Sequence, residues 1–201
     1  MLKIIKNKLQ IKGFTLIELI VAMSVFVILT SVAVGGFINM MRNQRIVTAM
    51  MAVNDNMGLT LEQMAREIRT GYNFCRISSS KIQFVNAKNE VVRYRLNNES
   101  VEKGISATSG SQTPGCDDAS DSWFSYGKII ADNVSINKFD IKVCGKNIDN
   151  SIVLGNCGSG DSRFPPRITL SLSITSAEPD VKKIGVYVNT QTTVSSRIIK
   201  K

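Results

Sequence analysis

Residues 13–34 read GFTLIELIVAMSVFVILTSVAV, and this stretch decides how the chain is organised. Glu18 is its only charged residue, and the basic segment MLKIIKNKLQIK precedes it. As an α-helix, the 21 residues from Phe14 to Val34 measure about 31 Å, which matches the hydrocarbon thickness of a bilayer. The lysines ahead of the apolar run predict that the amino terminus stays in the cytoplasm. We therefore expect the rest of the chain to lie outside the cytoplasmic membrane.

Three interpretations of this amino terminus compete. A secretory signal peptide would be cut near the small residues Ser31, Ala33 and Gly35, although the apolar run exceeds the roughly 7–15 residues usual for such a signal. A plain transmembrane helix would anchor an external domain. Neither explains Glu18, because a carboxylate inside a bilayer costs about 2–3 kcal/mol and requires a partner or a function.

The third interpretation accounts for all of these features. Residues 12–23, KGFTLIELIVAM, resemble the prepilin cleavage motif of type IV pilins and type II secretion pseudopilins. The resemblance implies cleavage between Gly13 and Phe14 by a prepilin peptidase, followed by N-methylation of Phe14. Further implied partners are other pilin or pseudopilin subunits, an inner-membrane assembly platform and, before assembly, membrane lipid. The implied location is the inner membrane and then a periplasmic or cell-surface filament.

The resemblance also implies a role for Glu18 in setting the assembly register. Its carboxylate would meet the new amine of Phe14 on a neighbouring subunit, so that two costly buried charges neutralise each other. The alternative is a carboxylate tolerated near the membrane interface by snorkelling. In the same family a stretch just beyond the membrane span can melt on assembly, and Gly35 and Gly36 would provide that flexible point here, since two glycines weaken a helix by about 1–2 kcal/mol.

A second apolar pattern extends the helix beyond the membrane span. Apolar residues recur at spacings of three and four, which places them on one face of a helix. They are Ile46, Met50, Val53, Met57, Leu61, Met64 and Ile68. Gly71 after Thr70 predicts the end of the helix. We expect the methionines of this face to pack in a core rather than to form a metal or cofactor site.

From residue 71 onward the apolar pattern changes to a period of two, which predicts strands. The expected strands are 81–85, 91–96, 136–143, 152–154, 167–174 and 183–188, with a hairpin turn at 86–90 and a loop at 107–122. A long helix followed by an antiparallel sheet is an α+β fold. The expected domains are a basic leader at 1–13, a long helix at 14–70 with its transmembrane half at 14–34, and an extracytoplasmic β-rich head at 71–201.

Weaker similarities concern the subtype. Residues 61–69, 167–174 and 192–197 look similar to segments of the J-type minor pseudopilins of type II secretion and of the W-type minor pilins. This resemblance implies a minor, initiating or tip-proximal subunit rather than the abundant shaft subunit.

The four cysteines all lie in the predicted head: Cys75, Cys116, Cys144 and Cys157. An even number of cysteines outside the cytoplasm favours disulfides. Three connectivities are possible, and we prefer Cys144–Cys157, which closes a local loop and leaves Cys75–Cys116. A metal site is disfavoured because the chain has no CxxC pair and no histidine.

Composition disfavours catalysis and nucleic-acid binding. Without histidine there is no Ser-His-Asp or Cys-His nucleophile and hardly any catalytic zinc site, and we predict no catalytic residue and no cofactor. The net charge is +9, but four of the cations belong to the leader and the others are scattered, whereas nucleic-acid binding requires a clustered basic face. The acidic loop at 117–122 has oxygen ligands of the kind calcium prefers, but it lacks EF-hand spacing, and a solvated acidic loop is the favoured interpretation.

The sequence thus predicts a non-enzymatic structural subunit of a type IV pilus or type II secretion filament. Two alternatives remain open. One is a single-pass membrane protein whose external head binds a ligand, and it would keep its leader. The other is a DNA-uptake pilin, which requires a contiguous basic face on the head.

Overall fold

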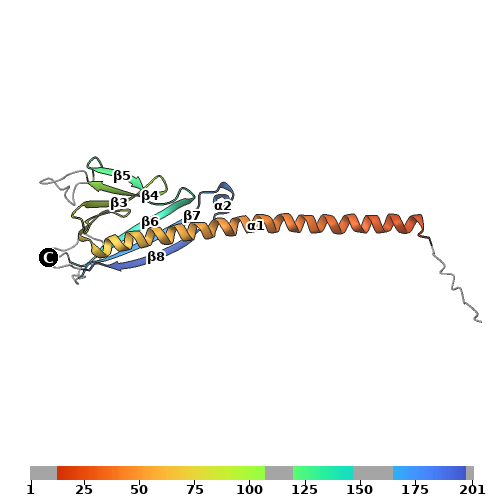
Figure 1. The fold of residues 1–201 in the computed structure, drawn as a ribbon, viewed down its shortest axis with the longest axis horizontal. Coiled ribbons are helices and arrows are strands. Elements are labelled where there is room, and N and C mark those ends of the chain that lie inside the picture. Colours follow the sequence, from red (N-terminus) through yellow and green to blue (C-terminus); the bar gives the residue numbers. More distant parts are fainter. Residues whose placement is uncertain (1–12, 107–119, 147–164, 198–201) are drawn as a thin grey trace, which may run out of the picture. The chain divides into compact units, whose positions relative to one another are not determined.

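The computed structural model describes residues 13–106, 120–146 and 165–197 (Figure 1). A long helix, α1, comes first, and the remainder of the chain is mostly strands. The elements are α1 (Leu16–Thr70), β1 (Tyr72–Ser78), β2 (Lys81–Val85), β3 (Val91–Asn97), β4 (Ser100–Ser106), β5 (Phe124–Lys128), β6 (Val134–Cys144), β7 (Arg167–Ser176), α2 (Pro179–Ile184) and β8 (Val188–Ser195). The chain divides into two compact units between Arg45 and Ile46. We call the described residues up to 45 the stem and those from 46 onward the head.

The stem is the first part of α1, and its polar side chains are satisfied within the helix. The hydroxyls of Ser24, Thr30 and Ser31 donate to carbonyls three or four residues earlier, at 2.8–3.0 Å. Such back-bonding lets Ser and Thr sit in an apolar helix without orphaned hydroxyls. The helix is long and apolar enough to cross a membrane, and none of its most apolar window is buried. The stem therefore has no apolar cover of its own.

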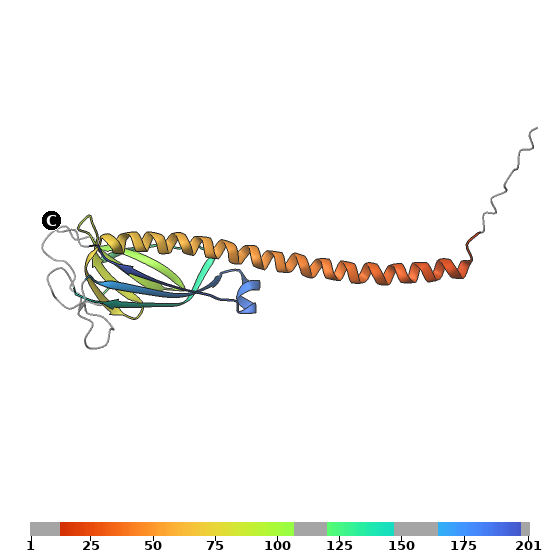
Figure 2. The ribbon, with the colours of Figure 1, turned by 90° about the horizontal axis from the view of Figure 1, so that it is seen from below.

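The head contains two antiparallel sheets, one of strand order β1-β2-β3-β4-β5 and one of order β6-β7-β8. The sheets adjoin where β1 meets β6. Ile141 N donates to Ser79 O at 2.7 Å, and Arg76 Nε donates to Ile141 O at 2.6 Å. Both sheets lie alongside the head part of α1 (Figure 2).

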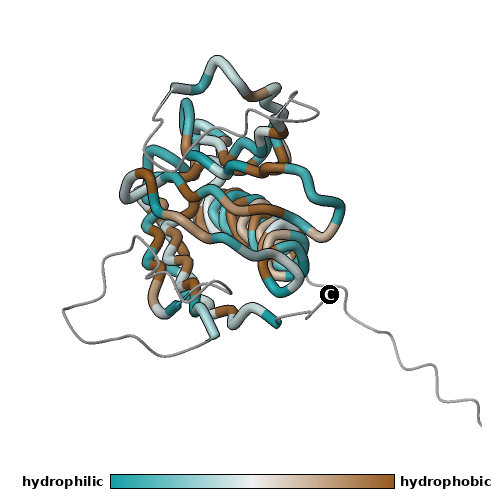
Figure 3. Tube along the Cα trace, turned by 90° about the vertical axis from the view of Figure 1, so that its left-hand side faces the viewer, coloured by the Kyte–Doolittle hydropathy of each residue, from teal (hydrophilic) through white to brown (hydrophobic). Residues whose placement is uncertain are grey.

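The core of the head forms between this part of α1 and the sheets. The Phe84 ring stacks on Phe74, with centroids 5.3 Å apart, and lies tilted against Tyr94, with centroids 5.9 Å apart. They join one apolar cluster with residues of the head part of α1, and Figure 3 shows hydrophobic segments, in brown, next to this helix, which is seen end on. The buried residues of α1 are Val53, Met57, Thr60, Met64 and Ile68, and all except Thr60 belong to the cluster. The apolar face predicted from the sequence is therefore confirmed, with Ile46, Met50 and Leu61 half-buried at its margin.

The predicted α+β class is confirmed, as is the end of the helix at Thr70. The expected strands 81–85, 91–96, 136–143 and 167–174 correspond to β2, β3, β6 and β7. Asn86 closes the β2–β3 turn, since its amide donates to Glu90 O at 3.0 Å and its Oδ1 accepts from the amides of Lys88 and Glu90. The expected strand 152–154 and most of the expected loop 107–122 lie outside the described residues.

The expected strand at 183–188 is wrong. Helix α2 ends at Ile184, and β8 begins only at Val188. Pro179 opens this helix, where its fixed φ and missing N–H are tolerated. Gly185 ends it in the left-handed conformation, with φ 73°, which glycine adopts without strain. Proline just inside the start and glycine just past the end were a readable helix signal.

Candidate functional site: the amino-terminal motif and the stem

The Gly13–Phe14 peptide bond lies just ahead of α1, in non-helical backbone. Thr15 caps the helix, since its Oγ1 accepts from Glu18 N at 3.4 Å and its carbonyl from Leu19 N at 3.3 Å. Thr15 and Glu18 have the spacing of a capping box. Phe14 is 81% exposed. The bond predicted to be cleaved is therefore outside the helix and accessible.

Gly13 has open space around it. A methyl group added at its Cα would meet no atom within 4 Å. Alanine is thus compatible with this structure at position 13. A glycine required here would be required by an enzyme that binds the backbone closely, not by the fold.

Glu18 lies in the first turn of α1. The exposed amide groups of a helix amino terminus favour a negative charge at this position. Glu18 is exposed, and its carboxylate makes no ion pair with another described residue. A cationic group from another molecule can therefore approach it.

Gly35 and Gly36 lie inside α1, where the helix is unbroken. Both are exposed, and an added Cβ at either position would meet no atom within 4 Å. No packing contact among the described residues therefore requires glycine there. Their role as a flexible point stays a prediction.

The stem presents large apolar side chains around its whole circumference. From Phe14 to Met41, eighteen of them are between 43 and 81% exposed. An exposed apolar surface of this extent marks an interface with lipid or protein.

Of the four predicted disulfide cysteines, the described residues include Cys75 on β1 and Cys144 at the end of β6. Cys75 is 1% exposed, and neither residue is a free thiol. Cys116 and Cys157 lie outside the described residues, so the preferred pairing stays a prediction.

The acidic loop contains an unexpected feature at Asp121, which is not a solvated carboxylate. It accepts hydrogen bonds from Lys81, Arg93, Arg95 and Tyr126 at 2.6–3.1 Å. Arg93 is fully buried, and its guanidinium also lies 4.1 Å from the centroid of the Phe124 ring. The interpretation of this loop as solvated is therefore wrong for Asp121, while Asp117 and Asp118 lie outside the described residues.

The charge on Asp121 is strongly stabilised. Burial by itself raises the pKa of this carboxyl, but hydrogen bonds from Tyr126, Lys81, Arg95 and Arg93 outweigh burial and hold the pKa well below its usual range. Burial and the bond to Asp121 raise the pKa of Tyr126. Among the described residues there is no group of three or more potential metal ligands. Asp121 serves as the counter-ion of a cationic sheet face.

Sequence reasoning missed this cluster, although a signal was present. Lys81 and Gln83 on β2, and Arg93 and Arg95 on β3, alternate with apolar residues, so they share one face of the sheet. A face with several cations on adjacent strands requires an anion. The sequence does not say which distant acid supplies it.

The comparison with protein families gives one match. Residues 9–34 match the model described as the prokaryotic N-terminal methylation motif. No curated protein and no solved structure matches the chain. The motif indicates a prepilin and implies processing by a prepilin peptidase and assembly with other pilins, and proteins with this motif are structural. The helix that carries the motif is compatible with membrane anchoring. The motif is that of type IV pilin-like proteins, and the long helix followed by antiparallel sheets is a pilin-like architecture.

Proposed function

We propose that the chain is a non-enzymatic minor pilin or pseudopilin of a type IV pilus or type II secretion filament. A prepilin peptidase cleaves it after Gly13, and Phe14 becomes N-methylated. Residues 1–13 are the removable leader, 14–70 the long helix, with 14–34 in the inner membrane before assembly, and 71–201 the extracytoplasmic head. Glu18 sets the register between subunits, and disulfides Cys75–Cys116 and Cys144–Cys157 stabilise the head.

One observation carries this proposal: the bond at which the motif predicts cleavage lies directly ahead of α1, and the apolar side chains of the stem are exposed. The Gly13–Phe14 bond is outside the helix, Glu18 is in its first turn, and the apolar side chains beyond are exposed. An ordinary signal peptide would remove the apolar helix, whereas cleavage at this bond keeps it. A retained helix is what a subunit needs in order to pack with others.

The charges of the head support a structural role over nucleic-acid binding. Many of the cations described in the head are engaged by acids, as in the pairs of Arg95 with Glu102, Lys103 with Glu67, and Lys182 with Glu99. Cations held in such pairs are less available to phosphates.

The test is the mass of the amino-terminal peptide of protein purified from its native membrane. We expect a mature chain that begins at N-methylated Phe14, and retention of the leader in Gly13→Ala. Gly35→Ala is the matched control, because this glycine also has open space but lies outside the motif, and it should be processed normally.

Two other results would reject the proposal. A wild-type chain that still begins at Met1 would indicate a single-pass membrane protein, and one that begins near Gly35 would indicate a secreted protein. Mapping of non-reduced peptides from the same sample tests the disulfides, since Cys75 should be recovered linked to Cys116.

A further inference from the structure

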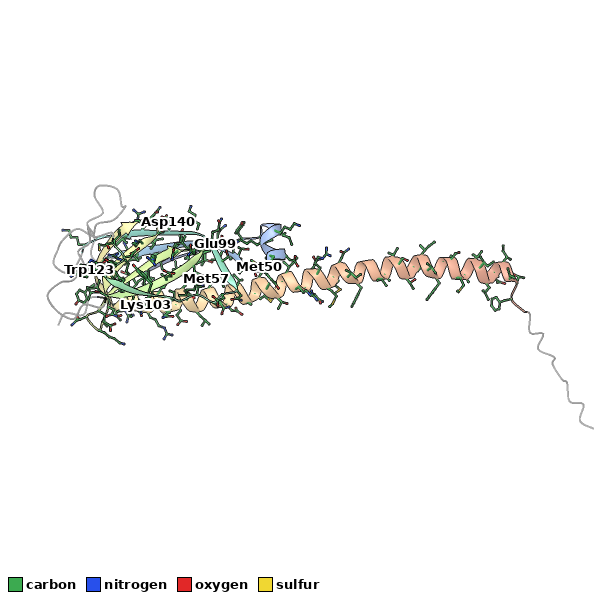
Figure 4. All side chains as sticks on the ribbon, turned by 90° about the horizontal axis from the view of Figure 1, so that it is seen from above. Met50, Met57, Glu99, Lys103, Trp123 and Asp140 are labelled. Carbon is green, nitrogen blue, oxygen red and sulfur yellow. The ribbon has the colours of Figure 1, made fainter. Side chains whose placement is uncertain are left out.

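An apolar groove lies at the beginning of the head part of α1. Its volume is about 510 Å³, and it is lined by residues of α1 between Ile46 and Asp55 and by Val186, from the segment between α2 and β8. Figure 4 labels Met50 on the α1 side of this groove. A cavity of about 150 Å³ is enough to bind a benzene molecule. The groove therefore has room for two large side chains.

The side chains at the groove continue the exposed apolar surface of α1 beyond the stem. Val47 and Met51 line the groove and are 51% and 63% exposed, and Val186 is 38% exposed. Helix α1 runs without a break from the stem into this segment. The exposed apolar side chains of α1 therefore do not end at Met41, and a partner that covers the stem can extend onto the groove.

Asp55 places a negative charge at the groove. The residue is exposed, and its carboxylate makes no ion pair with another described residue. Arg42 and Arg45, which follow the apolar run of the stem, are also exposed and have no ion-pair partner in the described part of the chain. A carboxylate repels an anionic lipid surface and attracts a cation. The charges thus favour an apolar helix that ends in a cation as the occupant of the groove.

The stem contains a row of side chains that matches the groove. Phe37, Met41 and Arg45 are spaced by four residues, which places them on one face of a helix. Phe37 and Met41 are 63% and 43% exposed. We call these three residues the stem row.

The groove has a row of the same spacing and of opposite charge. This groove row consists of Val47, Met51 and Asp55. Each row has two apolar residues followed by one charged residue. The rows come into register when one helix is displaced along a parallel one by 55 − 45 = 10 residues, about 15 Å.

We propose that the groove binds the stem of a second copy of the chain, parallel to α1 and displaced by ten residues. This inference rests on the proposed function, because copies inserted in one membrane have the same orientation and a filament brings their stems together. The apolar residues of the stem row fill the groove, and Arg45 pairs with Asp55. Burial of apolar surface drives the association, while the exposed ion pair contributes little energy and sets the register.

This contact differs from the one predicted for Glu18. Glu18 meets the amine of Phe14 on a neighbour when the two stems are displaced by 18 − 14 = 4 residues, about 6 Å. The groove requires a displacement of ten residues. A subunit therefore makes the two contacts with different neighbours.

The test is disulfide cross-linking between full-length chains that carry two different tags and are expressed together in their native cells. One chain carries Met41→Cys and the other Met51→Cys. Mild oxidation should give a linked product with both tags, because the proposed displacement places these positions side by side. Met23→Cys, at another exposed methionine of the stem, is the matched control for Met41→Cys, and with it the product should be lost. Equal yields would overturn the proposal.

A second cysteine position tests the register. A displacement of 55 − 42 = 13 residues would place Arg42 beside Asp55 and Ile38 beside Met51. Ile38→Cys should therefore cross-link to Met51→Cys less than Met41→Cys does. A higher yield for Ile38→Cys would overturn the displacement of ten residues and the pairing of Arg45.

Charge reversal tests the ion pair. Arg45→Asp or Asp55→Arg alone should lower the yield of the product between positions 41 and 51 about fivefold. Both changes in every chain should restore it, whereas Arg42→Asp with Asp55→Arg, the matched control, should not. Because Asp55 is exposed, the melting temperature of the head should stay unchanged in these variants. A yield that stays low in the Arg45→Asp/Asp55→Arg variant would contradict the pairing.

The mass of the amino-terminal peptide from the same samples separates this inference from the proposed function. A retained leader would reject the proposed function, and the groove contact with it. A processed chain without the product between positions 41 and 51 would reject the groove contact alone. Lipid as the occupant would appear as quenching of a fluorophore on Met51→Cys by spin-labelled lipid in such a chain, and this result would also overturn the proposal.

Discussion

The stem and the head meet the same two requirements, covering apolar groups and pairing polar ones, in opposite ways. In the stem, Leu29 and Phe37 are 64% and 63% exposed, while the hydroxyls bond to carbonyls of their own helix. In the head, Met64 and Phe84 are fully buried, and polar groups pair between strands. The stem is thus complete in its hydrogen bonds but not in its apolar cover. The stem therefore needs lipid or other protein subunits to cover its apolar side chains, whereas the head has a core of its own.

A matched pair of methionines should show the largest effect. Met64→Ala in the head core should cost about 2–5 kcal/mol, because it leaves a cavity. Met23→Ala makes the same chemical change at a stem position that is 60% exposed. It should leave head stability within about 0.5 kcal/mol of wild type. The free energy of unfolding of both variants is measured by urea unfolding in micelles, followed by the fluorescence of Trp123, the one tryptophan of the sequence. Equal losses in the two variants would contradict the difference between stem and head.

A lysine introduced into the stem and one introduced into the head should differ in their effect on membrane insertion, by somewhat less than the two methionine variants differ in stability. Val27→Lys should disfavour membrane insertion by about 2.5–3.5 kcal/mol, since a lysine near mid-bilayer is poorly solvated. Thr193→Lys, at an exposed position of β8, should insert like wild type. The fraction of protein that resists alkaline extraction from membranes is the measurement. Full membrane retention of Val27→Lys would show that the stem is not a bilayer helix.

Asp121→Asn tests the pairing of charges within the head. We expect the variant to have a free energy of unfolding lower by on the order of 1–3 kcal/mol at neutral pH, because Arg93 and Arg95 lose a charged acceptor. The folded-state pKa of Asp121 is lowered, so its contribution is present above the unfolded pKa of about 3.9 and is lost as pH falls through the folded value. The difference in free energy of unfolding between wild type and Asp121→Asn should therefore become smaller below about pH 4.

The control for this prediction is Asp132→Asn. This side chain is 93% exposed, and the variant should lie within about 0.5 kcal/mol of wild type at neutral pH. Urea unfolding at several pH values measures both variants. If the difference in free energy of unfolding between wild type and Asp121→Asn stays constant as the pH falls, the Asp121 carboxylate is not the counter-ion that stabilises this sheet face.

Glycine substitutions should give effects of opposite sign in the two regions, with the small one in the stem. Gly35→Ala should stabilise the local helix by about 1 kcal/mol, seen as slower amide hydrogen exchange at residues 32–38. At Gly71 an added Cβ would lie 2.6 Å from Phe84 Cδ2, so Gly71→Ala should destabilise the head by about 1–3 kcal/mol through overpacking. If the rate of amide hydrogen exchange is unchanged in Gly35→Ala, Gly35 does not weaken the helix.

The sequence predicted the elements whose side chains follow a single burial period. Residues 167–174 alternate Ile and Leu with Thr and Ser, and they form the central strand β7. The sequence analysis missed β4 because Glu102 and Lys103 look like loop residues. In the structure these charges are paired with Arg95 and Glu67, contacts between separate elements of the fold. It missed β8 because edge strands tolerate polar residues on both faces.

The candidate site divides in the same way. The cleavage motif is a local pattern, so Gly13, Phe14 and Glu18 could be proposed from the sequence without a fold. The cluster around Asp121 is different. The alternation along β2 and β3 indicates a cationic sheet face, but only the three-dimensional arrangement reveals that Asp121 supplies its anion.

The bond between Arg197 N and Arg69 O, at 2.6 Å, has a mechanical consequence. It joins the residues after β8 to the last turn of α1, while Val186, just before β8, lines a groove with Ile46 and Asp55. Strand β8 therefore runs in the same direction as the head part of α1. A tension along α1 would pass into β1 through the covalent chain, and this bond provides a second connection, into β8. Along that connection the force would act parallel to the β7–β8 ladder, whose register pairs run from Arg167–Ser195 to Ile174–Val188.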